Sequence, residues 1–407
     1  MSVVVTLPSR LASTDSIDAN RIAAAGFAKA LGDERGGSVI LTPEGVRTPN
    51  AAEQEAIRTG VVRRGSRRGA AALPVQMRLA LAELDAAATS RWLERTWSES
   101  IGPGVDLILG FHHRRHRAAR RLARRAGVPF VARVEAVETI EDRVWGVRRM
   151  GWDAVALRDE ARELSMADVV ASVSPAVDGQ LDAIGIDEGR RVVVPNGVDV
   201  ERFAPAPRDD ELVQRHRLHG RFIVCWVGGF RPFHGLASIP AIAAAARHLA
   251  PVVTFVLVGT GPVFDDVRSA TAGLDNVVLT GPASRDEVVR WIRTSDACVL
   301  LAGDGVFHYS PLKLLEYQSS GRPVVATADA DPGRWIRDGI DGLRVPAPSA
   351  VPAAIAALAA DRSMVARFGA AARARVIADA SWAARASELL RAVEDRGHAM
   401  AVGEDRR

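Results

Sequence analysis

Residues 307–317 carry the side chains best suited to hold a phosphate. Ser310 is a good N-cap, and Pro311 suits the first turn of a helix, where its missing N–H costs nothing. A helix that begins here directs the free N–H groups of its first turn, including that of Leu312, toward a ligand, and such an end favours phosphate. Lys313 lies in the same turn, where a cation opposes the helix dipole. Its placement therefore indicates an anionic ligand.

Two further features bear on this helix. Only two of the 53 basic residues are lysines, Lys29 and Lys313, so the position of a lysine is informative. Glu316 follows Lys313 by three residues on the same helical face, and its carboxylate can accept hydrogen bonds from ribose hydroxyls. An ordinary Lys–Glu pair on a helix surface is the alternative, and spacing alone leaves both open.

Glycine-rich turns follow three predicted strands of the second half. Glycine permits close approach of the backbone to a ligand, and arginine offers a planar fork for phosphate. Together with the loop before Ser310, these turns lie at one edge of a sheet and outline a crevice of nucleotide size. The residues concerned are Gly229, Arg231 and His234 in the first turn, Gly259 and Gly261 in the second, and Pro282 in the third.

Candidate acid–base residues lie at strand ends in the first half. Glu135 follows the predicted strand at residues 130–134, and His113 follows the one at residues 105–109. Activation of an acceptor hydroxyl needs a carboxylate or an imidazole close to it, so these two residues are the candidates. Structural or solvent-facing roles are the competing interpretation.

A basic stretch follows the same strand. Residues 112–125 contain seven arginines, three histidines and no acid, with apolar residues at helical spacing. The plain interpretation of the Arg114–Arg125 helix is a solvated face. The alternative is a patch for an anionic membrane or a phosphorylated acceptor. An aromatic content of 5% and the lack of a groove-reading motif argue against nucleic acid as a partner.

These residues need a scaffold, and the pattern predicts one. Short β-branched runs alternate with helical patterns, which is typical of βαβ units on parallel sheets. A Pro-Asn-Gly turn at Pro195, followed by two more prolines, separates two such series. We expect two doubly wound α/β domains facing a cleft (residues 1–200 and 201–380), then a C-terminal helix and tail (381–407). Residues 45–69 predict a loop or insertion, and residues 349–396 predict three helices without a strand. The predicted strands are 3–6, 38–41, 105–109, 130–134, 169–173, 191–194, 222–227, 252–258, 277–279, 297–301 and 323–326.

The composition bounds the class of protein. A length of 407 residues suggests two domains, and 48% hydrophobic with 25% charged residues is ordinary for a globular protein. Cys225 and Cys298 stand in apolar runs and are expected to be buried free thiols, too few for a cysteine-based zinc site. The chain shows neither a signal peptide nor an unbroken membrane-spanning stretch, so we expect a cytoplasmic protein, with peripheral membrane contact left open.

The motifs of the second half, taken in order, resemble a known family. They are VPNGVD at residues 194–199, GGFRPFHG at 228–235, VLVGTGP at 256–262 and YSPLKLLEYQSSGRPVVAT at 309–327. They are similar to the retaining GT-B nucleotide-sugar glycosyltransferases of family 4, over roughly residues 128–382. The resemblance implies two Rossmann-like domains, with the acceptor bound by the first and the donor nucleotide by the second. It also implies a final helix that crosses back to the first domain.

The resemblance assigns roles to the donor-side residues. Glu316 matches the second glutamate of the family's paired-glutamate motif, which holds the donor ribose. His308 stands where the first glutamate is usual, and we expect it to contact the donor sugar or diphosphate rather than act as a nucleophile. His308, Glu135 and His113 are thus the catalytic candidates.

The diphosphate site departs from the family pattern. Gly229 and His234 stand where the family commonly has the arginine and lysine that clamp the diphosphate. We therefore expect Arg231 and Lys313 to supply that positive charge. Base recognition is expected to be largely by backbone, near residues 281–283.

The sequence therefore predicts a retaining transferase that moves a sugar from a nucleoside diphosphate to an acceptor hydroxyl. No metal or other cofactor is expected, because cations and a helix N-terminus stabilise the leaving diphosphate. One alternative is a nucleotide-sugar epimerase or hydrolase, which would convert donor without acceptor. A second is a degenerate, non-catalytic binding module, favoured by the missing first glutamate. Polysaccharide, glycolipid and secondary-metabolite pathways all stay open.

Overall fold

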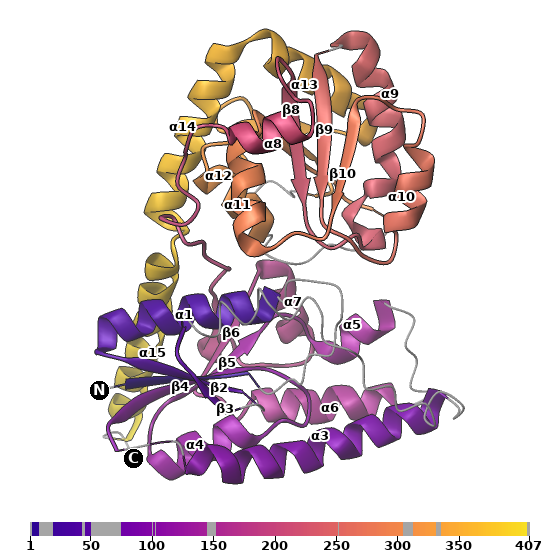
Figure 1. Cartoon of the computed structure of the whole chain (residues 1–407). Helices are drawn as coiled ribbons and strands as arrows, with labels where there is room; N and C mark the ends of the chain where they lie inside the picture. Colours follow the sequence, from indigo (N-terminus) through magenta and orange to yellow (C-terminus); the bar gives the residue numbers. More distant parts are fainter. Residues whose placement is uncertain are drawn as a thin grey trace.

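The computed structural model describes residues 2–7, 19–42, 45–49, 75–99, 101, 103–144, 152–250, 252–303, 312–330 and 335–404. Within these residues the chain forms two α/β units, each built on its own sheet (Figure 1). The unit of the first half lies below the unit of the second half in this view. A long helical segment at the C-terminus runs along one side of both.

The first unit is a seven-stranded sheet in the order β3-β2-β1-β4-β5-β6-β7. All neighbours are parallel except β3, which pairs antiparallel with β2. Its central strands are apolar runs buried on both faces, as parallel strands covered by helices must be. The strands are β1 (Ser2–Thr6), β2 (Ser38–Thr42), β3 (Gly45–Arg47), β4 (Val105–Phe111), β5 (Phe130–Val134), β6 (Val169–Ser172) and β7 (Arg191–Val193).

Helices cover both faces of this sheet. α1 and α15 lie on the face toward the second unit, and α3, α4 and α6 lie on the outer face (Figure 1). Local signals set some of their starts: Ser174 caps α7 by accepting from the N–H of Val177, and Pro175 occupies the first turn. The helices are α1 (Ala19–Arg35), α3 (Val75–Ser98), α4 (Ala118–Ala126), α5 (Glu138–Val144), α6 (Asp153–Leu164) and α7 (Pro175–Ala183).

The second unit is a six-stranded, wholly parallel sheet in the order β10-β9-β8-β11-β12-β13. Both cysteines are buried free thiols on its adjacent strands β8 and β11, as expected. The strands are β8 (Phe222–Val227), β9 (Val253–Val258), β10 (Val277–Gly281), β11 (Ala297–Leu300), β12 (Val324–Thr327) and β13 (Gly342–Val345). The helices are α8 (Asp210–Arg215), α9 (Ile239–Leu249), α10 (Phe264–Ala270), α11 (Arg285–Thr294), α12 (Leu312–Ser319), α13 (Val351–Ala360) and α14 (Arg362–Asp379), and the last helix, α15 (Trp382–Glu404), packs on the first unit.

Trp382, the first residue of α15, links this helix to the first unit. Its ring lies 5.2 Å from that of Phe27 on α1. A Cβ at Gly26 would lie 2.2 Å from the indole, and one at Gly197 would lie 2.8 Å from it. These two glycines therefore make room for the tryptophan, and Ala386 and Leu389 extend the same buried cluster along α15.

Two strands and one loop differ from the sequence prediction. All eleven predicted strands are present with ends within two residues of those predicted, but β3 and β13 were missed. The prediction of a loop from residue 45 is wrong for residues 45–47, which form β3. Both missed strands are sheet edges of three or four residues, too short to show a period-2 pattern. The prediction of three helices without a strand in the tail is confirmed by α13, α14 and α15.

Candidate functional site

Three strand-end loops of the six-stranded sheet contact one another through their backbones. The N–H of Phe230 donates to the carbonyl of Thr260 (3.0 Å), and the N–H of Gly259 donates to that of Gly281 (2.9 Å). Gly259 has a φ of 123°, and a Cβ there would lie 2.1 Å from the carbonyl oxygen of Gly228. Only glycine fits such a position. The structure thus brings together the three turns in which donor-binding residues were predicted.

Lys313 faces these loops from the first turn of α12. Part of its chain is exposed, but its Nζ is buried and lies 4.4 Å from the centre of a Trp226 ring. A Cβ at Gly228 would lie 2.8 Å from Nζ, so a side chain there would displace the ammonium. Among the described residues Nζ has no hydrogen-bond partner. Burial lowers the pKa of Lys313 to about 7, although the nearby charge of Glu316 opposes the shift.

An ammonium group in this setting is costly for the fold. A buried donor without a partner loses its hydration, and a charged one loses more than a neutral one. The face of Trp226 compensates in part through a cation–π interaction. A phosphate at this position would supply both the missing charge and the missing acceptors.

His234 and Arg231 belong to the loop opposite Lys313. His234 Nδ1 lies 2.5 Å from the carbonyl oxygen of Gly229, which can only accept, so Nδ1 carries the proton. Burial, with Lys313 and Arg231 nearby, lowers the pKa of His234 to about 2. The imidazole is therefore neutral and its Nε2 is an acceptor. Arg231 and Lys313 therefore remain the two side chains predicted to bind the diphosphate.

Glu316 lies one turn further along α12 and is paired. Its Oε1 accepts from Arg285 Nη2 at 2.5 Å, and the two side chains are only 5% and 6% exposed. Both residues line a pocket between the two units, together with Gly26 and Lys29 of α1 and Asp199 of the connecting turn. Lys29 Nζ lies 3.9 Å from Asp199 Oδ2 in this pocket. The carboxyl ends of the second sheet therefore face α1 of the first unit.

The histidines after β4 each face a glutamate. His113 Nδ1 lies 2.6 Å from Glu138 Oε1, and His112 Nε2 lies 3.2 Å from Glu160 Oε1. Burial raises the pKa of Glu138, but the hydrogen bond and charge of His113 outweigh it and bring the pKa to about 2. Burial likewise lowers the pKa of His112, and the contact with Glu160 outweighs it, so the pKa is raised. The Glu160 carboxylate therefore stabilises the charged form of His112.

Glu160 also holds the backbone of α5. It is fully buried and accepts from the N–H groups of Glu138 (2.7 Å) and Thr139 (3.0 Å). This carboxylate ties α5, α6 and the loop after β4 together. His113 Nε2 is buried and has no hydrogen-bond partner in the described part of the chain. A role for His113 in acid–base chemistry stays a prediction.

Glu135 is engaged by a buried arginine. Its Oε1 accepts from Arg133 Nε at 2.8 Å, and Arg133 is 1% exposed. The same guanidinium donates to Asn196 Oδ1 (3.0 Å) and to the carbonyl of Val194, which lie in the turn between the units. This contact favours the structural interpretation of Glu135. Its catalytic role stays a prediction.

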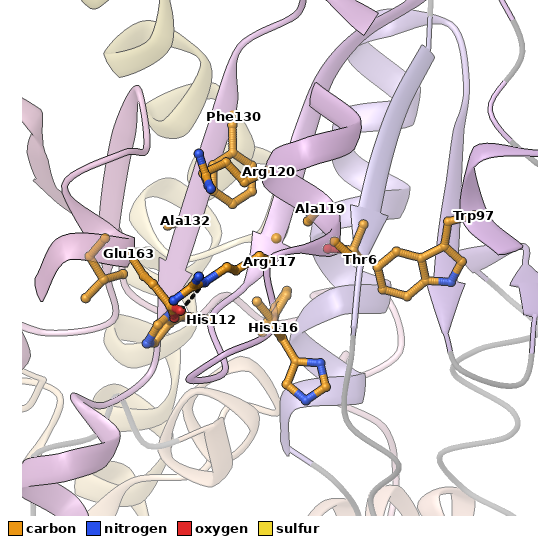
Figure 2. Close-up of a pocket in the computed structure, with 14 residues that line it drawn as sticks. Thr6, Trp97, His112, His116, Arg117, Ala119, Arg120, Phe130, Ala132 and Glu163 are labelled. Carbon is orange, nitrogen blue, oxygen red and sulfur yellow. Dashed lines mark hydrogen bonds and ion pairs between the residues drawn. The ribbon is translucent and has the colours of Figure 1, made fainter. Parts of the chain in front are cut away.

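The arginine-rich stretch is largely ion-paired. Figure 2 shows Arg117 directed at Glu163, and its Nε lies 2.5 Å from Glu163 Oε1. Arg121 and Arg125 both reach Glu94 of α3, at 2.7 and 3.1 Å. The acids stand on α3 and α6, so a stretch without acids in the sequence is not without acids in space. These contacts favour the interpretation as a structural, solvated face.

Some predicted residues cannot be placed. His308, Ser310 and Pro311 lie outside the described residues, whereas Leu312 begins α12 and Pro282 follows β10 at the surface. Sequence reasoning missed Arg285, Trp226 and Glu160. Their contacts join residues at least 21 positions apart in the sequence, and no local pattern indicates such pairs.

The described residues also bear on metal and membrane binding. No group of three or more His, Cys, Asp or Glu side chains that could hold a metal ion occurs in the described ranges. No single helix there has the length and apolar character to cross a membrane. The segments 348–360 and 362–379 meet those criteria only as a pair, bent by 104° at the break between them.

Two α/β units that face each other across a pocket define a class of two-domain α/β proteins, and comparison with known proteins identifies the family. The model described as Glycosyltransferase Family 4 matches residues 24–202, and the one described as Glycosyl transferases group 1 matches residues 221–361. The chain belongs to this glycosyltransferase family and has the GT-B fold.

Curated relatives agree with that membership. A GDP-mannose-dependent alpha-mannosyltransferase of Mycobacterium tuberculosis is 30% identical over 271 residues, which are 66% of this chain and 67% of the relative. A D-inositol 3-phosphate glycosyltransferase of Arthrobacter sp. is 28% identical over 251 residues, 59% of this chain and 58% of the relative. The match to the Arthrobacter protein thus spans less than two thirds of its length.

Solved structures show the same fold over nearly the whole chain. Anabaena HepE in complex with UDP has a TM-score of 0.69 at 15% identity, covering 97% of this chain and all of that one. Sucrose-phosphate synthase of Thermosynechococcus elongatus has a TM-score of 0.66 at 16% identity, covering 98% and 99%. At this level of identity the likeness concerns the fold alone.

Proposed function

We propose that the protein is a retaining glycosyltransferase that moves a sugar from a nucleoside diphosphate to an acceptor hydroxyl. The observation that carries the proposal is the buried ammonium group of Lys313 beside Gly228. It has no hydrogen-bond partner among the described residues. It lies where three glycine turns meet and where α12 begins. Family membership supplies the reaction class, and this site supplies a place for the diphosphate.

The proposed chemistry follows from charge. As the glycosidic bond to the diphosphate breaks, negative charge grows on the phosphate oxygens. Lys313 and Arg231, with the N-terminal turn of α12, are preorganised to stabilise that charge. We propose that these cations suffice without a metal. The acceptor hydroxyl attacks from the face that the diphosphate leaves, so the configuration is retained, and the departing phosphate takes the proton.

The remaining donor residues take supporting roles in this proposal. Gly229, Gly259 and Gly261 keep the backbone close to the nucleotide, and Pro282 lies in the turn proposed for the base. Glu316 holds the ribose. His308, outside the described residues, is proposed to contact the sugar or diphosphate.

A thermal-shift screen tests the function. Relatives are named for GDP-mannose and a structural neighbour binds UDP-glucose, so the panel contains both donors, UDP, GDP and, as unrelated nucleotides, ATP and NAD. We expect either UDP and UDP-glucose, or GDP and GDP-mannose, to raise the melting temperature. The unrelated nucleotides should leave it unchanged. No shift with any diphosphate sugar would contradict the proposal and favour a non-catalytic module.

Acceptor and membrane partners are the finer part of the proposal. The helix predicted over Arg114–Arg125 begins only at Ala118 as α4, so its first four residues form a turn and loop instead. Contact of the Arg114–Arg125 stretch with an anionic membrane, and a cytoplasmic location, stay predictions. Burial, with Arg117 and Arg121 close by, lowers the pKa of Arg120, so some positive potential persists on this face. Pelleting with anionic vesicles at low and high salt tests the contact, and pelleting independent of salt and lipid charge would contradict it.

A further inference from the structure

Arg285 is a buried cation at the first residue of α11. Its Nη2 donates to Glu316 Oε1, and its guanidinium carbon lies 4.7 Å from the centre of the Phe203 ring. It is 5% exposed, so both its charge and its stem are removed from water. Among the described residues, Arg285 forms its ion pair with the carboxylate of Glu316.

The local fold does not favour an arginine at this position. α11 opens with a complete capping box: Ser284 accepts from the N–H of Glu287, and Glu287 accepts from the N–H of Ser284. The cap fixes the backbone that carries Arg285. A cation in the first turn opposes the helix dipole, and burial adds a desolvation cost. The arginine therefore gains its stability from Glu316 and Phe203 rather than from its own helix.

The pair leaves half of Glu316 available. Oε1 is occupied by Arg285, whereas Oε2 takes no hydrogen bond from any residue of the described ranges and is not among the buried unsatisfied atoms. Glu316 and Arg285 both line the pocket between the units. A carboxylate accepts hydrogen bonds and cannot donate, so the free oxygen suits a hydroxyl group.

We propose that Arg285 is a positioning residue that holds the Glu316 carboxylate in the orientation required to bind the donor ribose, and so sets the preference for ribonucleotides over deoxyribonucleotides. The inference rests on the proposed function. A planar guanidinium that contacts one carboxylate oxygen from one direction fixes the rotamer of the side chain as well as its charge. Without it, Glu316 would be a buried carboxylate free to turn away or to take up a proton.

The test compares binding of ribose and deoxyribose nucleotides by calorimetry. The probes are UDP and GDP, whichever binds the wild-type protein, and the matching 2′-deoxy and 3′-deoxy diphosphates. For wild type we expect a preference of about tenfold or more for the ribonucleotide, the size of one hydrogen bond to a charged group. For Arg285→Met we expect the preference to fall to about twofold or less, with affinity for the deoxynucleotide little changed.

Four further variants isolate the effect. Glu316→Gln should lose the preference, and its combination with Arg285→Met should lose no more, because the two residues act as one unit. Arg285→Lys keeps the charge without the planar fork and should give an intermediate preference. Arg290→Met is the matched control on the same helix, since Arg290 pairs with Asp209 and Glu211 away from Glu316. It should keep the full wild-type preference.

Each outcome decides the matter. A wild-type preference retained in Arg285→Met would overturn the inference and leave Arg285 a structural ion pair. If Arg285→Met does not fold, Arg285→Lys carries the same test, and an undiminished preference there overturns it. Failure of the proposed function is distinct, because then neither UDP nor GDP binds the wild-type protein at all.

Discussion

The strand ends of the two units use buried charge in opposite ways. After β4 in the first unit, His112 and His113 face Glu160 and Glu138, at 3.2 and 2.6 Å. After β11 in the second unit, Lys313 faces the ring of Trp226 and has no hydrogen-bond partner among the described residues. A cation that already has its carboxylate serves the fold. A cation without a hydrogen-bonded carboxylate is available to bind an anionic ligand.

The comparison shows why counting charges along the sequence misleads. The densest basic stretch, residues 112–125, forms ion pairs with acids on α3 and α6, which favours a structural role for it. Lys313, one of only two lysines in the sequence, gives the stronger indication of function. The difference lies in what surrounds the cation.

The largest expected effect is on stability in the first unit. Glu160→Ala should lower the free energy of unfolding by about 3–5 kcal/mol, because it leaves His112 buried without its partner and two backbone N–H groups without an acceptor. Chemical denaturation measures the loss. Nucleotide affinity of the folded protein should be unchanged, and a selective loss of binding with normal stability would break the comparison.

A second prediction concerns binding in the second unit. Arg231→Ala should weaken nucleoside diphosphate binding by roughly 10–100-fold, the loss of one charge-assisted hydrogen bond to phosphate. Arg247→Ala, which removes an exposed arginine on α9 paired with Asp275, is the matched control. Calorimetry should show wild-type affinity for the control. Equal affinities for the two variants would remove Arg231 from the diphosphate site.

The third prediction is a pH dependence of nucleotide binding. The pKa of Lys313 is about 7 in the ligand-free protein, and a bound diphosphate favours the ammonium form. The contribution of Lys313 is therefore present below pH 7 and is lost as the pH rises through the higher pKa of the complex. Affinity should fall by up to about tenfold per pH unit above 7, with proton uptake on binding. Titrations in buffers of different ionisation enthalpy detect that uptake, and a flat profile between pH 7.5 and 9 would contradict it.

A fourth prediction is a pH dependence of stability in the first unit. The pKa of His112 is raised, so its pairing contributes fully below its unfolded value near 6.5 and is lost as the pH rises through the folded value. The pKa of Glu160 is lowered, so its contribution is lost as the pH falls below about 4.5. The pair should contribute most between these limits. Denaturation of wild type and His112→Phe across pH 4–9 measures the difference, which a pH-independent gap would contradict.

The smallest expected effect is at the surface. Arg125→Ala should change stability by no more than about 1 kcal/mol, because Arg125 is 63% exposed and its ion pair with Glu94 is screened by solvent. A loss of several kcal/mol in denaturation would show that this face is more than a solvated one.

The sequence predicted what depends on local pattern. The buried run at Phe222–Val227 and the glycine turns after it follow from spacing and residue type, and their placement confirms the predicted fold. The pairs that tune the site could not be predicted. Arg285 and Glu316 are 31 residues apart, and His112 and Glu160 are 48 apart, so only the packing of α11 on α12 and of the β4 loop on α6 brings them together.

The central claim is that Lys313, whose Nζ has no hydrogen-bond partner among the described residues, binds the donor diphosphate. Calorimetric titration of UDP or GDP into wild type, Lys313→Met and the exposed surface control Arg247→Met measures its contribution. The account predicts at least about 30-fold weaker binding by Lys313→Met alone. The same variant should be more stable without ligand, by about 1–3 kcal/mol at pH 7, because it removes a buried unsatisfied donor. Wild-type affinity in Lys313→Met, or a loss of stability without a loss of affinity, would contradict the claim.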